Sequence, residues 1–157
     1  MKLNLSTTAA AAAVVLFSQA LVSQSAPDPW TSSELLEPAA LAQTLQSGKS
    51  KPPVIISVVF KALYDNKHLP HALYAGPGST PAGIEELKKA AAKLSKDSDI
   101  VLYCGCCPME KCPNIRPAYQ ALKQMGFTKV RVLRIPTNMA TDWFGKGYPS
   151  EDGPALK

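Results

Sequence analysis

Three short segments rich in branched and aromatic apolar residues place the strongest constraint on the fold of this chain. They are residues 54–60, 100–103 and 130–133. Apolar runs without polar alternation are typical of strands buried on both faces, as in parallel sheets that helices cover on both sides. Residues 84–94 lie between two of these runs and carry apolar side chains at helical spacing. The alternation predicts a small α/β domain with a central, mostly parallel sheet flanked by helices.

Three further segments complete this predicted domain. Residues 31–48 read as one helix that begins at a Thr-Ser-Ser-Glu start signal and ends at Gly48. Residues 65–71 are predicted to form a polar turn, and residues 72–75 a short edge strand before a Gly-Pro-Gly segment.

All four cysteines fall within nine residues, between the predicted strand at 100–103 and a helical pattern that starts at Pro113; they are Cys104, Cys106, Cys107 and Cys112. Proline suits the first helical position, which predicts Cys112 as the N-cap. Ligands of such sheets bind beyond the carboxyl ends of the strands. The free amides and the dipole of a helix N-terminus stabilise a thiolate. The segment is therefore a candidate active site with a nucleophilic cysteine.

The spacing of the cysteines alone also allows structural disulfides or a metal site. A paired Cys-x-x-Cys zinc pattern and a haem-attachment Cys-x-x-Cys-His motif are both absent, so the spacing gives no support to a metal. His68 and His71 are not predicted as ligands, because Pro70 between them prevents the regular helix that would align their rings. We expect no cofactor and no metal.

Residues 1–25 have the pattern of a secretory signal peptide, with a basic start, an apolar stretch and small residues before the cleavage point. The apolar stretch is too short to cross a bilayer comfortably, so no membrane anchor is expected. We expect a periplasmic or secreted protein with one domain at 28–150 and a flexible tail at 151–157. The formal net charge is +5, but no basic run is interleaved with aromatic residues, which argues against a nucleic-acid partner.

Four motifs, in order along about residues 30–150, resemble the rhodanese-like domain family. Residues 67–72 resemble its Gly-His-Ile-Pro-Gly-Ala turn, and residues 101–104 resemble the strand that delivers its cysteine. The other two are a helix with a Gly-Phe end before the next strand, at residues 122–133, and a Trp…Gly-Tyr-Pro ending, at residues 143–149. The resemblance implies a sulfurtransferase or persulfide carrier without a cofactor. Its partners would be a small sulfur donor, such as thiosulfate or a persulfide, and a thiol acceptor or a reducing partner protein.

The chain departs from the family pattern at three places. The Asp-x-Arg after the long strand is absent, the Gly-Gly before the last helix is replaced by residues 135–138, and the usual Cys-x-x-Gly-x-Arg loop is not reproduced. Counting from the strand selects Cys104 as the nucleophile, whereas counting back from the helix selects Cys107. Residues 103–110 resemble the Tyr-Cys-x-Cys-Pro-x-Glu loop of some members, with one extra cysteine. We predict that Cys107 is the nucleophile, with Cys104 as the alternative.

The remaining loop residues receive supporting roles in this interpretation. Cys106 and Cys112 are predicted to be resolving or accessory thiols. A cation in the first helical turn opposes the helix dipole, so Arg116 indicates an anionic substrate. Lys111, Met109 and Glu110 are predicted to contact that substrate as well. Two other functions stay open: a thiol–disulfide redox protein, and a non-enzymatic protein that binds a soft metal ion such as Cu(I) through its thiolates.

Overall fold

The computed structural model describes residues 27–48 and 51–153. The predicted signal peptide at 1–25 and residues 154–157 of the predicted tail lie outside the described residues. Within the described part of the chain, no helix has the length and hydrophobicity needed to cross a membrane.

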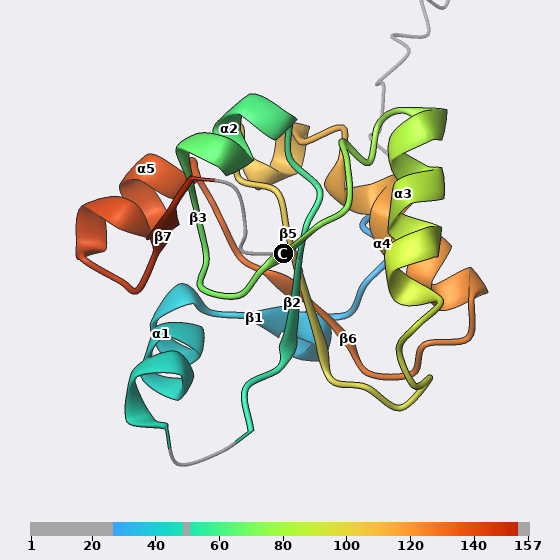
Figure 1. The fold of residues 1–157 in the computed structure, drawn as a ribbon, viewed down its shortest axis with the longest axis horizontal. Coiled ribbons are helices and arrows are strands. Elements are labelled where there is room, and N and C mark those ends of the chain that lie inside the picture. The colour runs from blue at the N-terminus through green and yellow to red at the C-terminus, as the bar shows by residue number, and fades with distance from the viewer. Residues whose placement is uncertain (1–26, 49–50, 154–157) are drawn as a thin grey trace, which may run out of the picture.

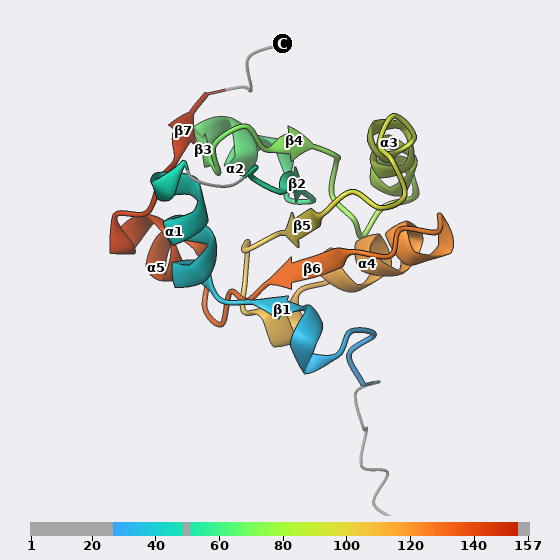
Figure 2. The ribbon, with the colours of Figure 1, turned by 90° about the horizontal axis from the view of Figure 1, so that it is seen from below.

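A five-stranded parallel sheet forms the centre of the fold (Figure 1), and Figure 2 shows its strands in the order β1-β6-β5-β2-β4. Every residue of the central strand β5 is buried, as its continuous apolar sequence predicts. The predicted α/β class and parallel sheet are confirmed. The strands are β1 (Leu35–Leu36), β2 (Val54–Ser57), β4 (Leu73–Tyr74), β5 (Ile100–Tyr103) and β6 (Val130–Leu133).

Helices cover both faces of this sheet. Figure 2 shows α3 (Pro81–Ala91) and α4 (Ile115–Gln124) on one side, with α1 (Pro38–Ser47) and α5 (Met139–Asp142) on the other. Leu87 of α3, Leu122 of α4 and Trp143, which directly follows α5, are fully buried in one hydrophobic core with the strands. This layering leaves the carboxyl ends of the strands as the edge at which loops carry chemistry.

The first predicted helix is shorter than the sequence indicates. Residues 31–48 contain a short 3-10 helix, η1 (Ser32–Glu34), then β1, and only then α1. The reason is Pro38 at the first turn of α1, because a residue that precedes proline is held out of the helical region. Glu37 is accordingly extended, with φ −69° and ψ 140°. The helix ends at Gly48, in the left-handed conformation, as predicted.

The predicted polar turn at 65–71 also contains regular structure. The chain forms α2 (Lys61–Asn66) and then β3 (Lys67–His68), which pairs antiparallel with β7 (Glu151–Asp152). Glu151 and Asp152, placed by sequence in a flexible tail, are thus part of a second, two-stranded sheet. His68 is buried, and its ring stacks on Tyr64 with centroids 4.0 Å apart, which is a packing role.

Candidate functional site

The cysteine loop leaves the sheet directly after β5, and Gly105 makes its first turn. Gly105 has φ +72°, in the left-handed region that favours glycine. A Cβ at this position would lie 2.3 Å from Cγ of Met139, and the Gly105 carbonyl accepts a hydrogen bond of 3.0 Å from the Met139 N–H. The turn is therefore pinned against the start of α5, and this contact fixes where the following cysteines point.

The loop brings the four predicted cysteines together as free thiols. The Sγ atom of Cys106 lies 3.3 Å from that of Cys104 and 3.4 Å from that of Cys107. The sulfurs of Cys104, Cys106 and Cys112 all lie within 4.8 Å of one another. Cys104 and Cys112 are buried, whereas Cys106 and Cys107 are partly exposed. Cys106 is thus the cysteine whose sulfur contacts both Cys104 and Cys107, and it is also partly exposed to solvent.

Cys112 is not the N-cap of α4, as the sequence analysis predicted. The helix starts at Ile115 with Asn114 as its N-cap, and Cys112 ends a short 3-10 helix, η2 (Met109–Lys111). Cys112 precedes a proline and is extended for that reason. A hydrogen bond with Cys104 is the main cause that lowers the pKa of Cys112 to about 7. The N–H groups of Asn114 and Ile115, at the start of α4, contribute to the same shift.

Asn114 joins this sulfur cluster to the rest of the fold. Its side chain is fully buried, and its Nδ2 donates to Sγ of Cys104 at 3.3 Å and, more weakly, to Sγ of Cys106 at 3.7 Å. Its Oδ1 accepts a hydrogen bond of 3.0 Å from the N–H of Ser79. Sequence reasoning missed this residue, although an asparagine after a proline at a helix start is a recognisable capping signal.

The hydrogen bonds between the sulfurs distribute their protons unequally. A hydrogen bond from Cys104, helped by Cys107, Cys112 and Asn114, lowers the pKa of Cys106 to about 5. The pKa of Cys104 is raised, because its thiol donates a hydrogen bond to Cys106, interacts with Cys112 and is buried. Burial and the neighbouring Cys106 raise the pKa of Cys107 to about 12. Negative charge in the cluster therefore centres on Cys106.

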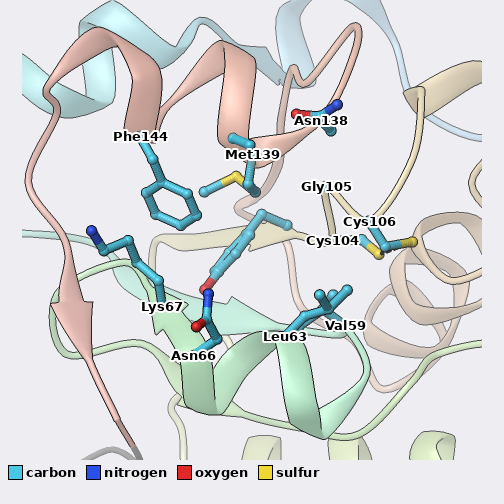
Figure 3. Close-up of a pocket in the computed structure, with 12 residues that line it drawn as sticks. Val59, Leu63, Asn66, Lys67, Cys104, Gly105, Cys106, Asn138, Met139 and Phe144 are labelled. Carbon is cyan, nitrogen blue, oxygen red and sulfur yellow. Dashed lines mark hydrogen bonds between the residues drawn. The ribbon is translucent and has the colours of Figure 1, made fainter.

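A cavity of about 280 Å³ opens beside Cys104 and Cys106 (Figure 3). Its wall is mainly apolar, and Lys67 brings a positive charge to it, with Nζ 5.6 Å from the centre of the Phe144 ring. The lining comes from the segments at and after the ends of β2 and β5, from α2 and β3, and from α5 with the residues beside it. It consists of Val59, Leu63, Asn66, Lys67, Tyr103, Cys104, Gly105, Cys106, Asn138, Met139, Ala140 and Phe144. Cys107, the nucleophile predicted from sequence, is not among these residues, and its role stays a prediction.

The four predicted substrate contacts lie elsewhere: Met109, Glu110 and Lys111 form η2 in the loop, and Arg116 lies in the first turn of α4. Arg116 binds Asp28 through Nη2 at 2.6 Å, and its Nη1 donates to the carbonyls of Met109 and Cys112. Its guanidinium thus ties the N-terminal segment to the cysteine loop. Lys111 and Glu110 are exposed, and Met109 is partly buried against the core. None of the four lines the cavity beside Cys104 and Cys106, and their predicted contact with a substrate stays a prediction.

Comparison with known proteins identifies a family and solved structures to which this chain is similar. The family model for the Rhodanese-like domain matches residues 37–134. Comparison with curated protein sequences gave no match. Among solved structures, a rhodanese-like domain from Anabaena is 22% identical with a TM-score of 0.56, and the match covers 79% of this chain and 86% of the other. A Bacillus halodurans protein is also 22% identical, with a TM-score of 0.57 and coverage of 74% and 75%.

A third similar structure carries a functional name. The thiosulfate sulfurtransferase from Pseudomonas aeruginosa is 24% identical, with a TM-score of 0.57. The match covers 78% of this chain but only 20% of that larger protein. At these identities the solved structures show a common fold.

Proposed function

Because this chain belongs to the rhodanese-like domain family, we propose that it is a sulfurtransferase or persulfide carrier with Cys106 as the thiol that accepts sulfur. The supporting observation is the position of Cys106. It follows the strand that delivers the family's cysteine, it is partly exposed, and it lines the cavity. Cys107 is partly exposed too, but it lies outside the lining of that cavity.

Sulfur transfer at this position needs two displacement steps. The Cys106 thiolate attacks the outer, sulfane sulfur of thiosulfate, the S–S bond of the donor breaks, and sulfite leaves with the bonding electron pair. Cys106 then carries a persulfide. An acceptor thiolate attacks the terminal sulfur, takes it as a new persulfide, and regenerates the Cys106 thiolate. The Nδ2 group of Asn114, 3.7 Å from Sγ of Cys106, is placed to stabilise the sulfur anion at both stages.

Cys104 gives the persulfide a second outcome. Its sulfur lies 3.3 Å from that of Cys106, so it can attack the inner sulfur of a Cys106 persulfide. This attack forms a Cys104–Cys106 disulfide and releases hydrogen sulfide. An external thiol reductant must then return the disulfide to two thiols. A reducing partner protein is therefore part of the proposal.

The proposed location is the periplasm or the outside of the cell. It rests on the signal-peptide pattern of residues 1–25. Mass spectrometry of the intact protein purified from each cell fraction tests it. A chain that begins at Ala26 in the exported fraction supports export, and a chain that retains residues 1–25 in the cytoplasm contradicts it.

Single serine variants test the choice of nucleophile. The assay measures transfer of sulfur from thiosulfate to cyanide by reduced, metal-free protein. We expect Cys106→Ser to reduce transfer to background and Cys107→Ser to retain it. Both residues are partly exposed, so both variants should fold and each serves as the control for the other. The reverse pattern would show that Cys107, the choice from sequence, is the nucleophile.

A further inference from the structure

Three of the four cysteines have a geometry that sulfur transfer does not require. We propose that Cys104, Cys106 and Cys112 form a three-thiolate site that binds one soft monovalent metal ion, Cu(I). Their sulfurs come from two separated parts of the loop and converge to within 4.8 Å of one another. A persulfide mechanism uses one sulfur, with a second to resolve it. The convergence of the third, from Cys112 at the far end of the loop, is left unexplained by that chemistry.

The distances fit a small ion placed between the sulfurs. Metal–sulfur bonds of roughly 2.3 Å in a planar trigonal arrangement place the sulfurs about 4.0 Å apart. The observed range runs from 3.3 Å, between Cys104 and Cys106, to at most 4.8 Å. Movements of less than 1 Å would therefore equalise the three sulfurs around an ion. Binding would release the remaining thiol protons to solvent, as metal binding to thiols does.

The donor set selects the kind of metal. The described residues contribute three cysteines to this group, with no histidine or carboxylate among them. Thiolate ligands favour soft ions. A structural zinc site takes four ligands, whereas Cys107 contacts Cys106 at 3.4 Å but lies outside the group of three. Three thiolates without a fourth protein ligand suit Cu(I).

Groups around the sulfurs would support the ligands. The buried Asn114 donates through Nδ2 to the sulfurs of Cys104 and Cys106, and its own position is held by the N–H of Ser79. The N–H groups of Asn114 and Ile115 face the sulfur of Cys112 at the start of α4. Hydrogen bonds of this kind orient metal ligands and reduce the cost of gathering negative charge. Cys106, on the cavity wall, leaves a route for the ion to enter.

The test is an anaerobic titration of the reduced protein with Cu(I) in competition with a coloured Cu(I) chelator. No sulfur donor is present, so the result is independent of sulfur transfer. We expect one equivalent of Cu(I) per chain. Cys106→Ser should weaken binding by more than about 100-fold, because the loss of an outer partner alone costs about 10- to 100-fold. Cys107→Ser is the matched control, since it removes a neighbouring sulfur outside the group, and it should bind as tightly as the original chain.

X-ray absorption at the copper edge provides a second readout that needs no variant. Three sulfur neighbours around copper would support the site, and so would the loss of one sulfur in Cys106→Ser. Three results would each overturn the proposal. They are failure of the protein to outcompete the chelator, an equal loss of Cu(I) affinity in Cys107→Ser and Cys106→Ser, and tighter binding of Zn(II) than of Cu(I) with four sulfur neighbours.

Discussion

Replacing Gly105 by alanine tests whether one tight turn positions the cysteine loop. Two costs follow from the structure. Any residue with a Cβ pays about 1 kcal/mol for the left-handed backbone at φ +72°. The new methyl group would also lie 2.3 Å from Cγ of Met139, a buried side chain that must move. Overpacking of this kind costs about 1–3 kcal/mol. We expect Gly105→Ala to lower the free energy of unfolding by about 2–4 kcal/mol, measured by urea denaturation under reducing conditions.

Gly147→Ala is the matched control for this experiment. Gly147 has almost the same backbone angle, φ +70°, but nothing lies within 4 Å of a Cβ built on it. It should therefore cost only the backbone part, about 1 kcal/mol. The difference between the two variants measures the contact with Met139. In a Met139→Ala background, which removes the obstructing atom, the two substitutions should cost the same. An equal cost of the two substitutions with Met139 intact would show that the contact with Met139 does not hold the turn.

Three further predictions concern the surroundings of the loop. Hydrogen bonds from the N–H of Thr31 and the hydroxyl of Tyr119 lower the pKa of Glu34 from 4.5 to about 2. The stabilisation from its carboxylate is therefore complete above pH 4.5, declines below that value and is lost as the pH falls through 2. Glu34→Gln should lower the free energy of unfolding by about 1–2 kcal/mol at pH 7, measured by urea denaturation, and by much less at pH 2, where about half of the Glu34 carboxyl groups are protonated. An equal cost at both pH values would contradict this. Asn114→Ala should lower the free energy of unfolding by about 2–3 kcal/mol and slow sulfur transfer. A variant of unchanged stability would show that the hydrogen bonds of the buried amide do not stabilise the fold. Added Cu(I) should inhibit sulfur transfer at one equivalent per chain, because both processes use Cys106. Unchanged activity with copper bound would show that copper binding and sulfur transfer use different residues.

The strands of the central sheet are the part of the fold that sequence predicts best. Residues 100–103 and 130–133 are observed as β5 and β6 with the expected bounds. Continuous apolar runs mark buried parallel strands because both faces are covered. The structure of residues 31–48 was harder to predict, since the spacing of their apolar residues resembles that of one helix. Only the extended residue before Pro38 shows that β1 ends before α1 begins.

The site was predictable as a cluster but not in its internal arrangement. Sequence identified the four cysteines and their place after β5. The choice among them depends on the path of the loop, which the contact between Gly105 and Met139 fixes. That contact joins segments far apart in the chain, and no local pattern indicates it. Local sequence marks Asn114 as a helix-start residue, but its contacts with Ser79 and Cys104 also join separate segments, and no local pattern indicates them.

The most direct test of the proposed chemistry is the mass of the reduced, metal-free protein after incubation with thiosulfate. We expect an adduct of about +32 Da, one sulfur atom, that a thiol removes, or a loss of about 2 Da in those molecules where Cys104 has resolved the persulfide as a disulfide. Cys104, Cys106 and Cys107 share the tryptic peptide 97–111, so the adduct is assigned by its loss in Cys106→Ser and its persistence in Cys107→Ser. A protein of unchanged mass, or an adduct that survives in Cys106→Ser, would contradict the proposal that Cys106 accepts sulfur.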